Sequence, residues 1–244
     1  MQVVPLGGQM IALAAVQLNQ ELYVCRMWDL ESGTEIESCD LDRPNIPVSY
    51  AGREWRLAVA GYLRKRPVTD LAATDTPYGP LAAVGGRASA IPVWSLASQE
   101  HVAELLVKGA SKPSILAFAP GYLFAGGDYG ELLGWRLAAW WPAGRDQPVV
   151  SRARRPARGY RIESADVRIP QAHYGPVQAL AGGTWNGRPC AVTGGRDGRL
   201  HSWTVQGEHL ATIDIGEPVT ALVNAGQGRY AAGTKRGLVI IENG

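Results

Sequence analysis

The stretch PCAVTGGRDGRLHSWTVQGEHLATI, residues 189–213, decides the fold. Its runs of small, β-branched and aromatic residues, at 189–195, 199–203 and 209–213, are separated by short polar turns that contain glycine. Runs this short, bounded by turn residues, predict β-strands, and helical periodicity over ten or more residues is hard to find anywhere in the chain. The stretch therefore predicts three antiparallel strands joined by tight hairpins.

The same pattern recurs along the chain, which is the signature of a repeat architecture. When Trp203 is placed on Trp135, GRDGRLHSW (195–203) and GDYGELLGW (127–135) are identical at four of nine positions. Weaker copies of this segment lie elsewhere in the chain, at 23–28, 86–94 and 233–242. Five related units are therefore visible.

Each unit is expected to contain four strands, because one further strand precedes the repeated segment and another follows it. The preceding strands are expected at 67–73, 114–119, 176–182 and 218–223, and the following ones at 31–39, 97–105 and 206–214. The step from Trp94 to Trp135 is 41 residues, the length of one four-stranded propeller blade. The fold class is therefore expected to be all-β, a β-propeller of about five to six four-stranded antiparallel blades with one blade degenerate or incomplete.

Composition agrees with a single packed domain over residues 1–244. Hydrophobic residues make up 46% of the chain and charged residues 19%, while 30 glycines and 16 prolines require many turns. The formal charge of +2 gives no overall attraction to nucleic acid or to an anionic membrane, and no apolar run has the length of a membrane helix. Three cysteines without a CxxC pair favour a reducing cytoplasm.

The unit at 172–213 carries a resemblance to WD-repeat β-propellers, in particular to their divergent bacterial members. Trp28-Asp29 is the literal WD pair of the chain. In that family a His, a Ser or Thr, an Asp and a Trp form an internal hydrogen-bonded network. The resemblance implies that the matching residues form this structural network here: His173, Thr193, Asp197 and Trp203.

The two ends of the sequence raise the question of how a ring would close. Residues 2–6, QVVPL, best fit the first strand of the first unit, while the last unit has three strands before Gly244. An unpaired edge near Val239–Ile241 would be a template for another strand. We expect this edge to be covered, with residues 2–6 favoured as the closing strand over a partner or a longer form of the protein.

No catalytic, cofactor-binding or metal-binding residues are expected. The step from His201 to His209 matches neither HExxH nor a Cys/His zinc pattern. No GxSxG motif occurs, and Cys25 and Cys190 lie in expected strands, where a thiol packs as a small hydrophobic group. None of the GG turns continues into a phosphate-binding GxxxxGK[ST] motif, so tight hairpins explain them.

An arginine-rich segment at about 143–170 is expected to be an insertion that projects from the blades. It carries seven arginines against three acidic residues. Such a segment is usually a solvated loop, although it could also bind an acidic protein or, with less support, a nucleic acid. The candidate partner-binding residues here are Trp140, Trp141, Arg152, Arg154, Arg155 and Arg158.

The function expected from these observations is that of a non-enzymatic scaffold or sensor subunit that binds other proteins in the cytoplasm. Arginine outnumbers lysine twenty to four, which suggests a GC-rich bacterial genome and, with the resemblance, a signalling or defence assembly. One alternative is a propeller that binds a small ligand or glycan on the tryptophans Trp55, Trp140 and Trp185. Another is an enzyme whose active site lies in the central channel.

Overall fold

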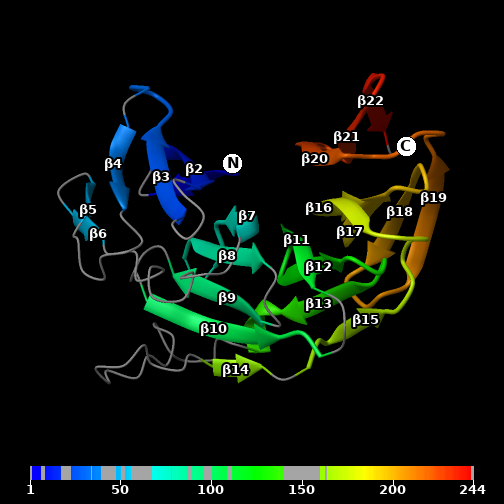
Figure 1. Cartoon of the computed structure of the whole chain (residues 1–244), viewed down its shortest axis with the longest axis horizontal. Helices are drawn as coiled ribbons and strands as arrows, with labels where there is room; N and C mark the ends of the chain where they lie inside the picture. The colour runs from blue at the N-terminus through cyan, green and yellow to red at the C-terminus, as the bar shows by residue number, and fades with distance from the viewer. Residues whose placement is uncertain are drawn as a thin grey trace. The chain divides into compact units, whose positions relative to one another are not determined.

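The computed structural model describes most of the chain and divides it into two compact units. The described residues are 2–6, 9–17, 23–33, 35–39, 48–50, 53–55, 68–77, 79–86, 90–95, 100–108, 112–139, 160–162 and 164–242. Unit 1 comprises Met1–Leu106 and Trp140–Ile162, and unit 2 comprises Val107–Ala139 and Glu163–Gly244. Figure 1 labels their strands, and we describe each unit by itself.

Unit 1 contains two large antiparallel sheets and a hairpin. The first sheet runs β1 (Gln2–Leu6), β2 (Gln9–Gln17), β3 (Tyr23–Asp29) and β4 (Glu35–Cys39). The second runs β7 (Val68–Thr74), β8 (Leu81–Gly86), β9 (Ala90–Ser95) and β10 (Glu100–Leu106), and β14 (Tyr160–Ile162) pairs with β10 in parallel. The hairpin consists of β5 (Val48–Tyr50) and β6 (Arg53–Trp55).

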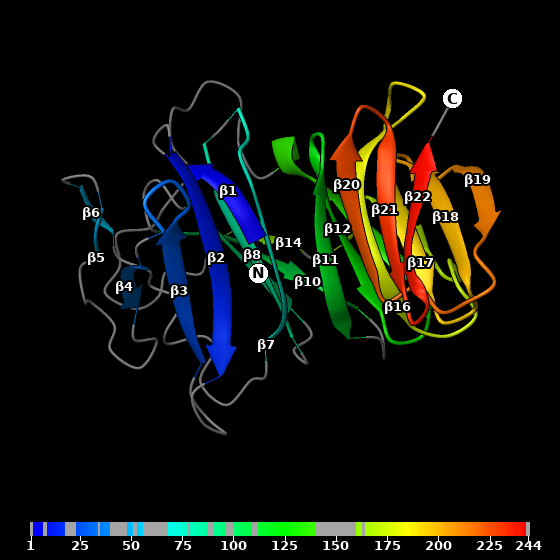
Figure 2. The same ribbon diagram turned by 90° about the horizontal axis from the view of Figure 1, so that it is seen from above.

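Unit 2 contains three antiparallel sheets. The third sheet of the chain runs β11 (Pro113–Ala119), β12 (Tyr122–Gly127), β13 (Leu132–Arg136) and β15 (Val167–Ile169). The fourth sheet runs β16 (Val177–Trp185), β17 (Arg188–Gly195), β18 (Arg199–Thr204) and β19 (His209–Asp214). The last sheet has three strands, β20 (Ala221–Gly226), β21 (Arg229–Thr234) and β22 (Gly237–Glu242), which lie side by side in Figure 2.

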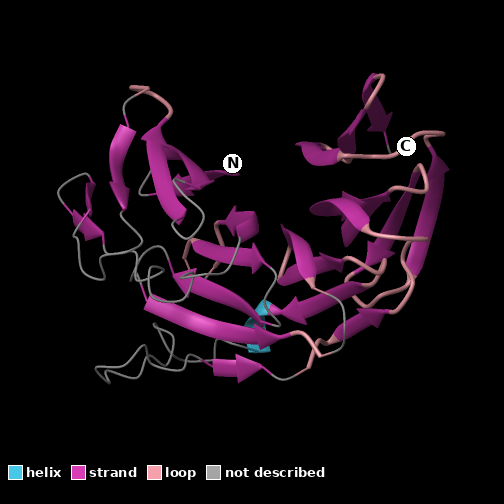
Figure 3. Ribbon diagram, in the orientation of Figure 1, coloured by secondary structure: helices cyan, strands magenta, loops and turns pink. Residues whose placement is uncertain are grey.

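The all-β class is confirmed, and five repeated sheets correspond to the five units expected from the sequence. The helix among the described residues is one short 3-10 turn, η1 (Leu137–Ala139), drawn in cyan in Figure 3. No helix in the described part of the chain is long and apolar enough to cross a membrane.

Successive sheets of unit 2 pack face to face through small and apolar side chains. Phe124 and Leu132 of the third sheet share a buried cluster with Trp203 of the fourth. Val192 on the opposite face of the fourth sheet shares a second cluster with Tyr230 of the last sheet. Because side chains alternate across a strand, the fourth sheet buries one face against the third sheet and the other against the last sheet.

Glycines make this close packing feasible. A Cβ atom added to Gly182 would collide with the backbone of Phe118 and Ala119 on the neighbouring sheet. Gly198 in the β17–β18 turn has a φ of +76°, and Gly130 in the equivalent turn has a φ of +84°. Only glycine adopts such values without steric cost, which explains the repeated glycine of the G-x-x-G motif.

Residues 2–6 pair with β2 as the first strand of the first sheet, as their fit to the first unit predicted. Among the described strands β22 pairs with β21 alone, so the expected closure of the last sheet by residues 2–6 is not observed. Of the segment expected to be an insertion, residues 160–162 and 167–169 form the edge strands β14 and β15 of two sheets, and residues 143–159 lie outside the described residues. The strand β15 was not predicted from the sequence, because three residues are too few to show an alternation of apolar and polar side chains.

Candidate functional site

The four residues of the expected structural network are joined by hydrogen bonds in the fourth sheet. His173 Nδ1 lies 3.0 and 3.1 Å from the two carboxylate oxygens of Asp197, and its Nε2 lies 2.8 Å from Thr193 Oγ1. Trp203 Nε1 donates to the same Thr193 oxygen at 3.1 Å. Thr193 is therefore the centre of the network.

Local structure explains how these residues meet. Thr193 and Trp203 lie on the paired strands β17 and β18, and Asp197 lies in the turn that joins these strands. His173 lies in the segment between β15 and β16. The His173 side chain is fully buried, so both of its ring nitrogens need partners, and the network supplies them.

Asp197 is held in its ionised form. Burial alone would raise the pKa of this carboxyl, but the hydrogen bond and proximity of His173 lower it, as do the backbone N–H groups of Arg199 and Tyr174. The net pKa lies below the usual value of 3.8. Because a carboxylate only accepts hydrogen bonds, His173 Nδ1 carries the proton in this contact.

Two more histidines, His201 and His209, lie beside the network. His201 Nδ1 and His209 Nε2 both contact Thr212 Oγ1, at 2.8 and 2.9 Å. The ring of His201 lies 4.7 Å from that of His173, centroid to centroid. Burial, followed by the nearby charge of His173, lowers the pKa of His201 to about 4, so His201 is neutral at pH 7.

This cluster contains the described residues with the best geometry for a metal ion. Ligand atoms of His173, Asp197 and His201 all lie within 4.8 Å of one another. Both ring nitrogens of His173 already take part in the network, so coordination would require the hydrogen bonds to Asp197 or Thr193 to break. The arrangement therefore fits a hydrogen-bonded support for the β17–β18 turn better than a metal centre.

The third sheet has the tryptophan of this network without its partners. By strand register Trp135 corresponds to Trp203, and Ala125 takes the place of Thr193. The indole nitrogen of Trp135 is buried and has no hydrogen-bond partner. The repeated tryptophan thus serves packing in both sheets, while the polar network belongs to the fourth.

A second polar contact joins the fourth and last sheets, and sequence reasoning did not find it. The hydroxyl of Tyr230 donates to the carbonyl of Thr184 at 3.0 Å and lies 3.3 Å from Cys190 Sγ. Burial raises the pKa of the Cys190 thiol, and burial followed by the thiol contact raises the pKa of Tyr230. A neutral, buried thiol is a poor nucleophile, so Cys190 has a packing role.

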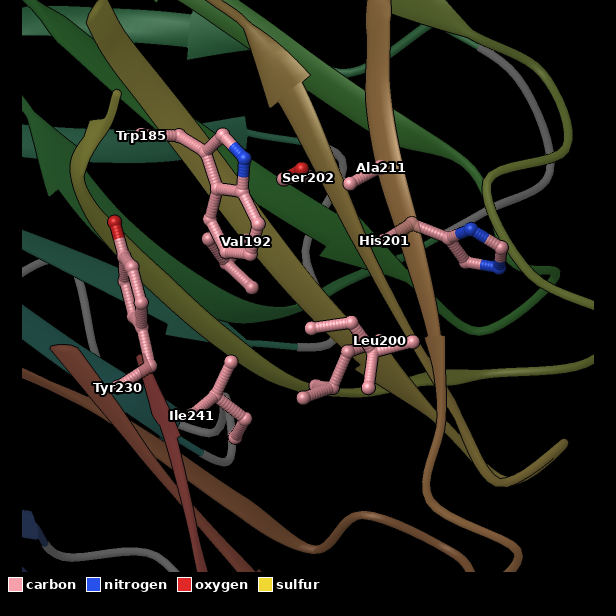
Figure 4. A pocket seen from close by; sticks show the side chains of 9 residues that line it. Trp185, Val192, Leu200, His201, Ser202, Ala211, Tyr230 and Ile241 are labelled. Carbon is pink, nitrogen blue, oxygen red and sulfur yellow. The ribbon is translucent and has the colours of Figure 1, made fainter. Parts of the chain in front are cut away.

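A small hollow lies beside this contact, between the fourth and last sheets (Figure 4). Trp185, expected as a platform for stacking a glycan, lines the hollow. Its ring stacks against that of Tyr230, with the two ring centroids 6.0 Å apart. The other lining residues are Val192, Leu200, His201, Ser202, Ala211, Ile213 and Ile241.

The expected partner-binding residues of the arginine-rich segment lie outside the described residues. These are Trp140, Trp141, Arg152, Arg154, Arg155 and Arg158. Trp55 belongs to β6. The structure therefore brings together the four residues of the expected network.

No protein-family model matches the chain. No curated protein matches it either. Among solved structures, a similar one is the crystal structure of the computationally designed Ika4 protein, with a TM-score of 0.49 and 20% sequence identity. The match covers 74% of this chain and 94% of that chain. A likeness of this degree does not establish a fold or a function.

Proposed function

We propose that the repeated sheets are blades of a β-propeller similar to WD-repeat proteins, and that the protein is a non-enzymatic scaffold that binds other proteins. The repetition of four-stranded sheets and the His-Thr-Asp-Trp network of the fourth sheet support the propeller. The composition supports a bacterial cytoplasmic assembly as its setting.

The observation that carries the binding function is an exposed apolar face on the last sheet. Val223, Leu238 and Ile240 are 57%, 68% and 54% exposed. Strand register places Val223 and Ile240 in one row across the sheet, with Leu238 two residues from Ile240. We refer to these three residues as the last-sheet face. Contiguous exposed apolar surface of this kind is typical of a protein interaction site, whereas the solvent-facing side of a sheet is usually polar.

Comparison with the fourth sheet shows that these are packing positions. The residues that correspond to Val223, Leu238 and Ile240 by register are Ala181, Leu200 and Ser202. All three are buried, with exposures of 6%, 2% and 2%. The last-sheet face therefore has the position and the apolar character of a packing surface, and the proposed scaffold function assigns a partner protein to it.

The titratable groups give no support to an enzymatic role. His173 and Asp197 bind each other and Thr193, and His201 shares Thr212 with His209. These contacts use both ring nitrogens of His173 and one ring nitrogen each of His201 and His209, so His173 has no free nitrogen to present to a substrate as a general acid or base.

The test is affinity purification from the native source with wild-type protein and a Val223→Glu/Ile240→Lys variant. The scaffold function predicts a bound protein that the variant loses while its melting temperature stays near the wild-type value, because both residues face solvent. Tyr129→Ser, at a side chain that is 67% exposed in the third sheet, is the matched control and should keep the partner. Identical binding by wild type and the double variant would contradict the assignment.

A further inference from the structure

Two of the three cysteines of the chain meet across neighbouring strands of the first sheet. Cys25 lies in β3 and Cys39 in β4, and the antiparallel ladder between these strands sets the two residues directly opposite each other. Opposite residues in such a ladder have Cα atoms about 4.5 Å or about 5.5 Å apart. Disulfides join cysteines whose Cα atoms are roughly 4.4 to 6.8 Å apart. The backbone register therefore places Cys25 and Cys39 within disulfide range.

An irregularity in the ladder sets these two cysteines opposite each other. Nearer the turn, Met27 pairs with Ile36. A regular continuation of this register would set Cys25 opposite Ser38. The register instead shifts by one residue between Met27 and Cys25, and Cys39 takes that place. A bulge of one residue changes which residues face each other across a ladder, so this bulge is the feature of β4 that creates the pair.

The turn between β3 and β4 holds the register at the closed end of the hairpin. Asp29 Oδ1 accepts hydrogen bonds from the backbone N–H groups of Glu31 at 2.8 Å and Ser32 at 3.2 Å. The N–H of Gly33 donates to the carbonyl of Asp29 at 2.9 Å, and Gly33 has a φ of +68°, which favours glycine. Slippage of β4 along β3 would break these contacts, so the turn opposes separation of the two cysteines.

We propose that Cys25 and Cys39 form a reversible disulfide between β3 and β4 by exchange with a small-molecule disulfide such as oxidised glutathione. In the first step, the thiolate of one cysteine attacks a sulfur of the small disulfide, which gives a mixed disulfide and releases one small thiolate. In the second step, the thiolate of the other cysteine attacks the protein sulfur of the mixed disulfide and releases the second small thiolate. The two protein thiols together lose two protons and two electrons, and the small disulfide takes up both to become two thiols.

The bond would act as an oxidation-dependent lock on the β3–β4 hairpin. In a reducing compartment the two thiols are the resting state, and a disulfide there is transient and responds to oxidation. When it forms, it closes a ring around the turn and pins the register of β4, whose ladder the bulge interrupts. The inference does not rest on the proposed scaffold function, because the cysteine pair belongs to unit 1 and the last-sheet face to unit 2.

The first test incubates the purified full chain with oxidised and reduced glutathione at varied ratios, blocks the remaining thiols and digests the product with trypsin. Trypsin cleaves after Arg26, between the two cysteines, so a disulfide keeps the two flanking peptides joined. We expect mass spectrometry of the monomeric protein to show these joined peptides, and a reductant to separate them. A glutathione adduct alone, a disulfide between two chains, or no joined peptides would overturn the proposal.

A displaced cysteine tests whether the bulged register matters. Ser38→Cys/Cys39→Ser moves one thiol by a single residue and keeps nearly the same length of chain between the two cysteines. Because residue 38 does not lie opposite Cys25, ring closure should be at least about tenfold slower than in wild type. Cys190→Ala removes the cysteine outside the pair and should react like wild type. Equal rates for the displaced variant and wild type would show that chain proximity alone drives the reaction, contrary to the assignment.

Thermal melting shows whether the bond fits the folded hairpin. Oxidised wild type should melt about 4 °C or more above reduced wild type, because the closed ring restricts the unfolded chain. Cys25→Ser and Cys39→Ser should each melt at one temperature under oxidising and reducing conditions, near that of reduced wild type. Oxidised wild type that melts at or below the reduced form would mean that the bond distorts the ladder, and the proposal would then be wrong.

Discussion

Thr193 shows how a single residue can organise a repeat unit. Its hydroxyl oxygen lies within hydrogen-bond distance of His173 Nε2, Trp203 Nε1 and the carbonyl of His201. The side chain is fully buried, so none of these groups can turn to water instead. The network therefore fixes the ring of His173 and the indole of Trp203 in one orientation.

Replacing this hydroxyl should destabilise the protein without changing its shape. Thr193→Val leaves the nitrogens of His173 and Trp203 unsatisfied, and we expect a loss of about 1 to 3 kcal/mol in the free energy of unfolding. His173→Ala and Asp197→Ala should fall in the same range. Thr220→Val removes an exposed hydroxyl and is the control, with an expected change within about 0.5 kcal/mol. Urea denaturation measures all four, and wild-type stability of Thr193→Val would refute the structural role.

His201 makes stability depend on pH. The unfolded chain takes up a proton at this residue near pH 6.5, whereas the folded chain does so only near pH 4. Between these values the unfolded state holds more protons, so the free energy of unfolding falls as the pH is lowered. Part of the effect is screened, because the ring is only half-buried.

The variant His201→Gln tests this linkage. It should lose less stability than wild type when urea denaturation is compared at pH 7.0, 5.5 and 4.5. Asp197 contributes little over this range, since its folded pKa lies below 3.8 and its contribution is lost only at lower pH. Parallel losses of stability in the two proteins would show that another group is responsible.

At the scale of the elements, glycine sets how closely neighbouring sheets approach. Gly182 on β16 leaves no room for a Cβ atom against the β11 backbone, and a backbone cannot move aside as a side chain can.

Gly182→Ala should therefore be among the most damaging single changes in unit 2. Overpacking of this kind costs about 1 to 3 kcal/mol. Gly233→Ala is the control, because its new Cβ atom would meet mainly the Cβ of Ala221, at 3.2 Å. Thermal melting followed by circular dichroism measures both. Equal melting temperatures would mean that the β11 and β16 backbones separate easily, contrary to the packing described.

At the scale of the whole molecule, the repeat explains both the regular and the irregular parts. The fourth sheet packs against the third sheet through one face and against the last sheet through the other. The last-sheet face has the equivalent position in the last sheet and is exposed. The proposed scaffold function assigns a partner protein to it.

The sequence by itself determined the strand class, the repeat and the residues of the network. These features can be recognised in the sequence alone, because they depend on strand-length apolar runs, glycine turns and the spacing of Trp135 and Trp203 rather than on contacts between distant residues. The short edge strands β14 and β15 could not be predicted, because three residues acquire strand geometry only from the neighbour with which they pair. Residues 2–6 were expected as the first strand of the first unit and form it, whereas their expected second role as a closing strand depends on which edges meet, and the structure shows them paired with β2. Burial of the Ser202 hydroxyl arises only when the fourth and last sheets meet.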